Sequence, residues 1–388
     1  MRANDYGLVV VGSGFVGSVI AYLASKAGQR VLLLERRDHI GGNMYDYMDP
    51  ETGILVQKYG PHSFHTNDDR VYDFVTSIWR WYPFTLTARA ELLGRLTPSP
   101  FNFRTVDEYF PPEEVRSIQK SLADEFRYAP KATILELLKS ANPIVRGYAE
   151  FLFEHDYRPY TAKQWGIAPE SLDISVLGRV PVRLDYTDRY FDDRYQMMPE
   201  QSFSAMFEKL LEHPLIDVRL NEDALTHLSA DTEAGVLLFD GDALRCPVVY
   251  TGAMDELFRG KYGRLPYRSL RFRLETHDAD SFQPTPGVAY PTAEGYTRIT
   301  EYTKLPPQNG HGKTIIAYEY PIPYAPDQHV EPYYPVLTPL SLEVLKRYNE
   351  EVKKIPNLYP CGRLGDFKYY NMDQAVLRAL EVYETITF

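Results

Sequence analysis

Two apolar runs, joined by a glycine-rich turn and a helical pattern, open this chain. Leu8–Val11 and Val31–Leu34 have the length and composition of buried strands, and the residues between them keep helical spacing up to Gly28. Three glycines stand at the turn with the spacing Gly-x-Gly-x-x-Gly: Gly12, Gly14 and Gly17. In such a turn the first glycine allows a tight bend, the second lets a pyrophosphate approach the backbone, and the third packs helix on strand. The pattern predicts a βαβ unit that binds a dinucleotide at the N-terminus of its helix.

An acidic residue and a second pair of glycines narrow the choice of dinucleotide. Glu35 ends the second apolar run, where a carboxylate would bind ribose hydroxyls. Gly41, Gly42 and Asn43 follow, and a paired glycine at this distance resembles the two-dinucleotide-binding-domain flavoproteins, which hold FAD in an extended form. The alternative is that Gly41 and Gly42 form only a loop turn. The expected cofactor is therefore FAD.

The composition restricts the classes of partner and the compartment. A chain of 388 residues can form two or three domains, and its net charge of −11 argues against nucleic acid or an anionic membrane surface as partner. No apolar run approaches the length of a membrane span and no signal peptide pattern opens the chain, so we expect a cytoplasmic protein. Cys246 and Cys361 lack companions at metal or disulfide spacing, which predicts buried thiols and no metal site.

Changes in residue pattern predict an α/β fold with two further parts. Residues 82–165 have the spacing of several helices, including a capping box at Thr105–Glu108 and a helix start at Pro112. Tyr267–Phe272 and Thr314–Tyr318 are typical of an antiparallel sheet. Three later segments are predicted to return to the nucleotide-binding domain, the last of them followed by a helix that opens at Asn371: Leu215–Leu220, Pro247–Gly252 and Leu358–Gly365.

We therefore expect a discontinuous Rossmann-like FAD-binding domain, an α-helical insertion and an antiparallel β-sheet domain. The FAD-binding domain is assigned to residues 1–80, 200–255 and 341–388. The helical insertion is assigned to residues 81–170, and the sheet domain to 171–199 and 256–340.

Seven short motifs occur in a particular order along the chain: Tyr59–Thr66, Pro100–Asn102, Tyr160–Gly166, Arg179–Arg183, Tyr296–Arg298, Glu331–Pro335 and Tyr369–Gln374. Together they resemble the UDP-galactopyranose mutase family, and the likeness covers nearly the whole chain. The resemblance implies an isomerase that interconverts the pyranose and furanose forms of a nucleotide sugar, UDP-galactopyranose and UDP-galactofuranose by default. It also implies that reduced FAD is the active form and that its N5 forms a covalent adduct with the sugar while the nucleotide diphosphate leaves.

The resemblance further implies a role for individual residues. Arg179 and Arg298 would bind the diphosphate, and His65 would belong to the catalytic group. Substrate contacts would come from Asn102, Tyr160, Thr161, Trp165, Tyr190, Tyr334, Tyr369 and Asn371. Tyr160 would stack on the base. FAD contacts would come from Gly12, Gly14, Gly17, Glu35, Gly42, Asn43, His62, Arg363 and Met372.

Two departures from the family pattern concern the substrate. The family usually carries a Phe-Phe-x-Gly run that lines the base pocket, whereas this chain has Asp156-Tyr157-Arg158-Pro159. The family commonly has an asparagine that touches the sugar where this chain has Ala289. Loss of a polar partner relaxes or changes the choice of substrate.

The departures keep several alternatives open. One is the same mutase chemistry on a dTDP-, GDP- or deoxy-sugar; others are an FAD-dependent oxidoreductase of the amine-oxidase kind and a flavin-binding protein without catalysis. The expected partners are a nucleotide-sugar substrate and an external reductant for the flavin. A homodimer is compatible with the sequence, which does not determine the oligomeric state.

Overall fold

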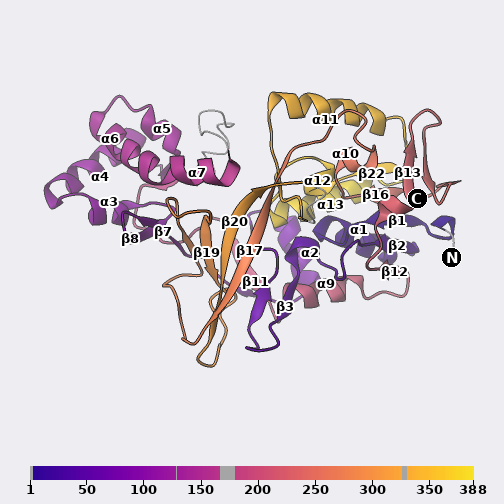
Figure 1. The fold of residues 1–388 in the computed structure, drawn as a ribbon, viewed down its shortest axis with the longest axis horizontal. Coiled ribbons are helices and arrows are strands. Elements are labelled where there is room, and N and C mark those ends of the chain that lie inside the picture. Colours follow the sequence, from indigo (N-terminus) through magenta and orange to yellow (C-terminus); the bar gives the residue numbers. More distant parts are fainter. Residues whose placement is uncertain (1–2, 128, 167–179, 326–329) are drawn as a thin grey trace.

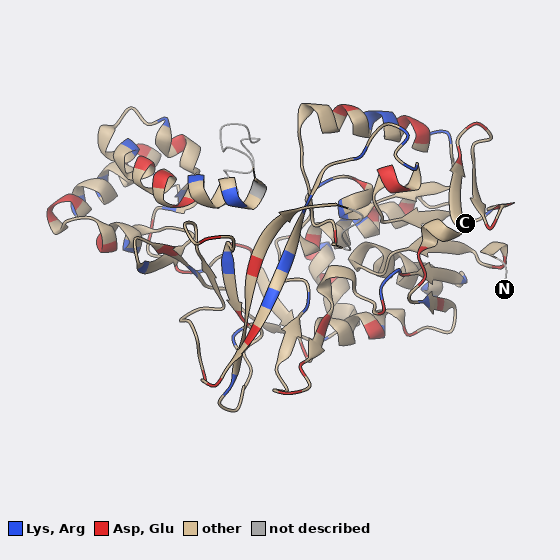
Figure 2. Ribbon diagram, viewed as in Figure 1, with Lys and Arg blue, Asp and Glu red and all other residues tan. Residues whose placement is uncertain are grey.

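The computed structural model describes residues 3–127, 129–166, 180–325 and 330–388. The chain forms three parts in a row, with helices α3 to α7 at one end, a long twisted sheet in the middle and a nucleotide-binding α/β part at the other end (Figure 1). Acidic and basic residues are interspersed in all three parts (Figure 2).

The α/β part is built on a five-stranded parallel sheet. Its order is β12 (Ile216–Arg219), β2 (Val31–Leu34), β1 (Leu8–Val11), β16 (Val248–Tyr250) and β22 (Leu358–Pro360). Every neighbouring pair is parallel. The two opening strands and the three returning strands predicted from the sequence are therefore confirmed.

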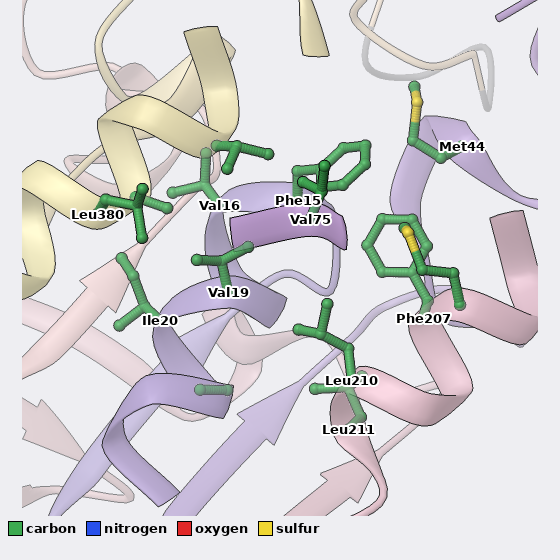
Figure 3. Close-up of a cluster of buried hydrophobic side chains, with 14 of the residues drawn as sticks. Phe15, Val16, Val19, Ile20, Met44, Val75, Phe207, Leu210, Leu211 and Leu380 are labelled. Atoms are coloured by element: carbon green, nitrogen blue, oxygen red, sulfur yellow. The ribbon is translucent and has the colours of Figure 1, made fainter. Parts of the chain in front are cut away.

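Helices cover both faces of this sheet. On one face lie α1 (Phe15–Lys26), α2 (Asp69–Ile78), α9 (Phe203–Leu211) and α13 (Met372–Thr385). Figure 3 shows their shared core, in which Ile20 of α1 lies beside Leu380 of α13. The other face is covered by α10 (Met254–Leu257), α11 (Pro339–Val352) and α12 (Gly362–Gly365). Each fully buried aliphatic side chain contributes about 1.5–3 kcal/mol, so the glycine turn before α1 is anchored to a rigid core.

The middle part is a seven-stranded sheet. Its order is β21 (Tyr334–Pro335), β17 (Tyr267–His277), β20 (Thr314–Pro323), β19 (Arg298–Glu301), β18 (Gly287–Ala289), β7 (Ala88–Leu92) and β8 (Arg95–Ser99). The pairs are antiparallel except β18 with β7. The register sets Arg298 opposite both Glu319 and Ala289, so these three residues share one face of the sheet.

The helical part begins later than the sequence predicts. Its elements are α3 (Phe103–Tyr109), α4 (Pro112–Phe126), α5 (Ile134–Leu138), α6 (Pro143–Leu152), the π-helical turn η3 (Phe153–Tyr157) and α7 (Arg158–Trp165). Residues 81–99 instead form β6 (Trp81–Pro83), β7 and β8, because β7 joins the sheet through β18, about 200 residues away in sequence. The capping box also lies earlier, since Asn102 caps α3 with Thr105.

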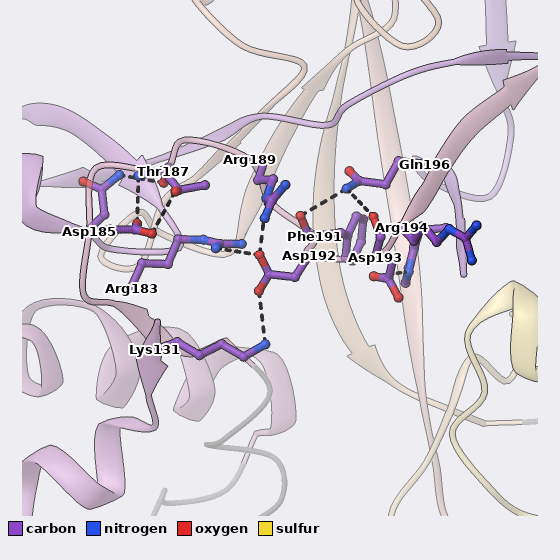
Figure 4. A network of polar contacts seen from close by, with 12 residues as sticks. Lys131, Arg183, Asp185, Thr187, Arg189, Phe191, Asp192, Asp193, Arg194 and Gln196 are labelled. Carbon is purple, nitrogen blue, oxygen red and sulfur yellow. Dashed lines mark hydrogen bonds and ion pairs between the residues drawn. The ribbon is translucent and has the colours of Figure 1, made fainter. Parts of the chain in front are cut away.

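The first segment assigned to the sheet domain does not join the large sheet in its described residues, 180–199. There β10 (Val182–Arg183) pairs with β9 (Lys131–Ala132), and β11 (Tyr195–Pro199) pairs with β5 (Phe64–Thr66) and β6. Asp192 accepts hydrogen bonds from Arg183 and Lys131, and this network holds the loop before β11 (Figure 4).

Smaller elements complete the described chain. These are the strands β3 (Asp46–Met48), β4 (Leu55–Gln57), β13 (Leu228–Asp231), β14 (Val236–Phe239) and β15 (Asp242–Ala243), and the 3-10 turns η1 (Ala3–Asp5), η2 (Gly42–Met44) and η5 (Ala224–Thr226). Cys246 and Cys361 are buried free thiols, as predicted. Within the described ranges, no helix is long and apolar enough to cross a membrane. Nor do His, Cys, Asp and Glu side chains gather there in a group that could hold a metal ion.

Candidate active site

A cavity opens where β1 and β2 end, and the glycine turn forms its floor. Gly12 has φ +94°, and a Cβ there would lie 2.2 Å from the Thr251 hydroxyl oxygen. A Cβ on Gly17 would lie 1.9 Å from the carbonyl oxygen of Gly12, so strand and helix approach as closely as the fingerprint requires. At Gly14, by contrast, nothing lies within 4 Å of the position of a Cβ, and its backbone faces the cavity. These residues fit a bound pyrophosphate.

Glu35 lines this cavity, and its carboxylate accepts hydrogen bonds from neighbouring residues. It is 5% exposed, and Oε2 accepts hydrogen bonds from the backbone N–H and the hydroxyl of Ser13, at 2.9 and 2.6 Å. Oε1 accepts from the backbone N–H of Arg37 at 3.0 Å. Each carboxylate oxygen can accept more than one hydrogen bond, so Glu35 can hold the turn and still accept from ribose hydroxyls.

Glu331, which is distant in sequence, forms ion pairs with Arg36 and Arg37 in the lining of the cavity. Glu331 Oε2 lies 2.5 Å from an Nη of Arg36 and 2.8 Å from an Nη of Arg37, and all three residues line the cavity. Burial opposes ionisation of Glu331, but the guanidinium groups of Arg37 and Arg36 lower its pKa to about 2. Arg37 also donates to Asn43 Oδ1 at 2.9 Å, which places the predicted Asn43 on the same wall.

The opposite wall comes from the C-terminal part of the chain. Arg363, Asn371 and Met372 line the cavity, with Asn371 as the N-cap of α13. Arg363 donates to the carbonyl oxygens of Tyr333 and Tyr370, at 3.2 and 2.7 Å. Its guanidinium therefore joins the segment before β21 to the segment before α13.

A second group of side chains, centred on Arg298, lies on the large sheet, and the charges of Arg298 and of the cavity residue Arg363 both act on His62. Arg298 Nη2 lies 2.5 Å from Glu319 Oε2, and the Glu319 side chain is 3% exposed. Although burial acts in the opposite direction, the Glu319 carboxylate raises the pKa of Arg298, so the guanidinium stays charged. Its Nε is buried and has no hydrogen-bond partner among the residues that the structure describes. A firmly held guanidinium therefore keeps one N–H unsatisfied by the described residues.

Tyr160 and Tyr334 lie within electrostatic range of Arg298. The rings of Tyr334 and Tyr369 are stacked with centroids 5.7 Å apart, and the Arg363 guanidinium lies 5.6 and 5.3 Å from them. Burial raises the pKa of Tyr334 to about 12, and the pKa of Tyr160 is also raised by burial. Their hydroxyls stay protonated at neutral pH and can donate hydrogen bonds to an anion.

His62 stands between the cavity and the arginine group. Burial lowers its pKa to about 3, and the charges of Arg363 and Arg298 act in the same direction. Its Nδ1 is buried without a hydrogen-bond partner among the described residues, while Gln57 binds its backbone N–H and carbonyl oxygen. His62 is therefore a neutral imidazole with one unused nitrogen.

Two predicted site residues have other contacts. His65 Nδ1 lies 3.0 Å from Asp193 Oδ2, and its ring stacks on Phe191 at 3.6 Å. These contacts follow from the pairing of β5 with β11. Asn102 is 0% exposed; its amide nitrogen donates to the carbonyl oxygen of Thr187 and its oxygen accepts from the backbone N–H of Arg104. Asn102 therefore serves as the N-cap of α3 and is not exposed to a ligand in this structure.

The remaining predicted residues lie on or near α7, or outside the described part. Thr161 is 7% exposed beside Tyr160. The backbone of Tyr190 is held by the carbonyl oxygen of Leu86, and its ring packs edge-on against Phe191 at 4.9 Å. Arg179 and the side chain of Trp165 lie outside the described residues.

Glu319 is the functional residue that the sequence analysis did not find. The only local signal is an acidic residue that interrupts the apolar and aromatic run of β20. Its partner Arg298 lies 21 residues earlier, and only the register of the sheet brings the two together.

Comparison with known proteins places the chain in a family. The model of UDP-galactopyranose mutase matches residues 156–369, and that of an NAD(P)-binding Rossmann-like domain matches residues 10–78. A UDP-galactopyranose mutase from Mycoplasma genitalium is 33% identical over 386 residues, which cover 98% of this chain and 95% of the relative. The chain belongs to the UDP-galactopyranose mutase family.

Other family members show the range of this likeness. A dTDP-fucopyranose mutase from Escherichia coli is 30% identical over 383 residues, which cover 96% of each chain. A crystal structure of reduced UDP-galactopyranose mutase superposes with a TM-score of 0.71 at 17% identity and covers 98% of this chain and 95% of that chain, which shows that the fold is shared.

Family membership decides between the alternatives left open by the sequence. The chain is an isomerase, so the amine-oxidase and non-catalytic alternatives are not supported, and its cofactor is FAD. The cavity at the ends of β1 and β2 has a glycine turn and an open backbone at Gly14 that fit this cofactor.

Proposed function

We propose that this chain interconverts the pyranose and furanose forms of a nucleoside-diphosphate sugar, with the sugar next to the flavin and the diphosphate at Arg298. Family membership supports the reaction class, and relatives named for UDP-galactopyranose and dTDP-fucopyranose support a nucleotide sugar as substrate. UDP-galactopyranose is the reference substrate, and the base and sugar of the natural substrate are open to test.

One observation carries the proposal. The Arg298 guanidinium is held by a buried carboxylate, keeps its charge and has a buried N–H without a partner among the described residues. A charged donor arranged in this way costs free energy unless an anion completes it. A diphosphate is such an anion, and charge-assisted hydrogen bonds to it contribute about 1.5–3 kcal/mol each.

The residues of the chain would act mainly by binding and by stabilising charge. Arg298 would hold the diphosphate as it departs, and the hydroxyls of Tyr160, Tyr334 and Tyr369 would donate to the same oxygens. Neutral His62 would place an uncharged imidazole beside the flavin, where its free Nδ1 could accept a hydrogen bond from a sugar hydroxyl. Bound, reduced FAD would supply the nucleophile, N5, for the anomeric carbon of the sugar.

The test uses the FAD-loaded enzyme after reduction with dithionite. Incubation with UDP-galactopyranose and with dTDP- and GDP-hexoses, followed by chromatography, is expected to show a furanose product from at least one of them and none with oxidised enzyme. Consumption of substrate with stoichiometric oxidation would contradict the proposal.

Substitution of the central arginine makes the test specific. Arg298→Ala is expected to abolish turnover while FAD absorbance is retained, because the arginine serves the diphosphate and not the cofactor. Arg271→Ala is the matched control, since Arg271 lies on β17 of the same sheet against the ring of Tyr320, on the opposite face of the sheet. Near-normal turnover in the Arg298 variant would refute the assignment.

A further inference from the structure

Asp156 occupies an unusual position between two helices. It lies in the π-helical turn η3, which connects α6 with α7. Turns of this kind are rare and are often found at functional sites. Asp156 precedes Tyr160 by four residues, so both side chains lie on one face of the helix. Tyr157 points elsewhere, because it is buried and its hydroxyl donates to the carbonyl oxygen of Val180 at 2.7 Å.

The carboxyl group of Asp156 has no partner in the described part of the chain. No hydrogen bond or ion pair joins it to another described residue, and burial alone raises its pKa to about 7. Glu154, two residues earlier, is exposed and forms an ordinary ion pair with Arg158. A partly buried, unpartnered carboxyl costs free energy in the empty protein. It is therefore expected to meet a ligand.

The position of Asp156 along the site indicates which part of the ligand it meets. The FAD cavity lies at one end, next to Arg363 and His62, and Arg298 follows. The charges of Arg298 and Asp156 both act on the pKa of Tyr160. Arg298 does not act on the pKa of Asp156, which burial alone raises. Tyr160 thus lies between the two. A nucleotide sugar with its sugar at the flavin and its diphosphate at Arg298 would place its base at Asp156.

We propose that Asp156 selects the nucleobase of the substrate, and that its carboxylate accepts two hydrogen bonds from guanine. This inference rests on the proposed function, which supplies the orientation of the nucleotide sugar. A carboxylate is an acceptor with two oxygens side by side. Guanine presents two adjacent donors, N1–H and N2–H, and so matches it with two charge-assisted bonds.

The other common bases match this carboxylate less well. Uracil and thymine present one donor, N3–H, between two carbonyl oxygens that repel a carboxylate. Adenine and cytosine present a donor next to a ring nitrogen that accepts. The substrate class that fits is therefore a GDP-sugar, one of the alternatives compatible with the motif Asp156-Tyr157-Arg158-Pro159.

Nucleotide binding to the FAD-loaded protein tests the proposal without turnover. GDP, UDP, dTDP and ADP are titrated separately, with flavin absorbance and calorimetry as readouts. Wild-type protein is expected to bind GDP at least 10-fold more tightly than the other three. Asp156→Asn, which replaces one acceptor oxygen with a donor, is expected to weaken GDP binding at least 10-fold and UDP binding less than about 3-fold.

A matched variant and a pH series complete the experiment. Glu154→Gln makes the same charge change in the same turn and is expected to leave all four affinities unchanged. The ratio of GDP affinity to UDP affinity is expected to rise as pH increases through about 7, because two donors favour the ionised carboxylate, whereas ionisation of the terminal phosphate is common to both nucleotides. The titratable neighbours Tyr157 and Tyr160 do not interfere, since burial raises their pKa values far above this range.

Several outcomes would overturn the inference. These are tightest binding of UDP or dTDP by the wild-type protein, equal weakening of all four nucleotides by Asp156→Asn, and a ratio of GDP affinity to UDP affinity that falls with rising pH. If the substituted protein does not fold, the wild-type nucleotide panel and the pH series still decide. Guanine selectivity without furanose product would contradict the proposed function alone, and furanose product without guanine selectivity would contradict this inference alone.

Discussion

Glu319 fixes the orientation of the Arg298 guanidinium through an ion pair. The carboxylate binds one Nη of the guanidinium while Nε has no partner in the described part of the chain, so the cation is fixed in orientation before any anion arrives. Both residues are in strands, which hold side chains more firmly than loops do. At the scale of the single residue, the site depends on a buried acid that itself touches no part of the proposed substrate.

Glu319→Gln is expected to weaken binding of a nucleoside diphosphate by about 10-fold or more, because the neutral amide holds the guanidinium less firmly. FAD content is expected to stay unchanged. Calorimetric titration of the FAD-loaded protein measures the effect. Glu275→Gln is the control, since Glu275 pairs with Arg273 at 3.0 Å on β17. Equal affinities of the Glu319 variant and the wild-type protein would show that Arg298 does not depend on this contact.

The turn between β1 and α1 is an element in which two glycines have opposite functions. Gly17 is closed in by the carbonyl oxygen of Gly12, whereas the position of a Cβ on Gly14 is open to the cavity. The fold requires a glycine at position 17, and we expect the cofactor to require one at position 14. Two substitutions of the same chemical size can therefore separate stability from cofactor affinity.

Gly14→Ala is expected to fold normally and to bind FAD at least 10-fold more weakly, because its methyl group would occupy space needed by the pyrophosphate. Gly17→Ala is expected to lose several kcal/mol of stability, since the overlap is with backbone. Fluorescence titration with FAD and thermal unfolding followed by circular dichroism measure the two effects. A stable Gly17→Ala protein would contradict the close packing of β1 and α1.

At the scale of the whole molecule, Glu331 joins distant segments across the mouth of the FAD cavity. Arg36 follows β2 and Glu331 precedes β21, and 295 residues separate them in sequence. The contact connects the parallel sheet with the large antiparallel sheet next to the cofactor. We expect this ion pair to slow the release of FAD.

Glu331→Gln is expected to speed the release of FAD several-fold and to lower the free energy of unfolding by about 1–3 kcal/mol at pH 6. Because the pKa of Glu331 is lowered to about 2, its stabilising effect is complete above pH 4.5 and is lost as the pH falls towards 2. Unfolding in urea at several pH values and flavin fluorescence after dilution measure these effects.

The exposed pair of Glu384 with Arg70 provides the control for this prediction. Glu384→Gln removes the same charge from an ion pair at 2.6 Å that is open to solvent, and is expected to change stability by less than about 1 kcal/mol. A difference between wild-type protein and the Glu331 variant that stays constant down to pH 2 would contradict the ionised, paired state of Glu331.

The sequence by itself determined the nucleotide-binding part and its cofactor. Glycine spacing, apolar runs of strand length and a helix cap at Asn371 are local properties, because they depend on the conformation and burial of neighbouring residues. These signals located the five strands of the parallel sheet and the residues that line the FAD cavity. The motif order also indicated the family.

The tertiary structure alone decided the features that depend on pairing over long distances. In the structure β7 and β8 join the large sheet, and Glu319 lies opposite Arg298. His65 contacts Asp193, and Asn102 caps α3. No local pattern contains this information, because a residue in a strand acquires its partner from the register of another segment. Asp156 and Glu154 are both acidic residues of the turn η3, and only the structure shows that Glu154 pairs with Arg158 whereas burial raises the pKa of Asp156.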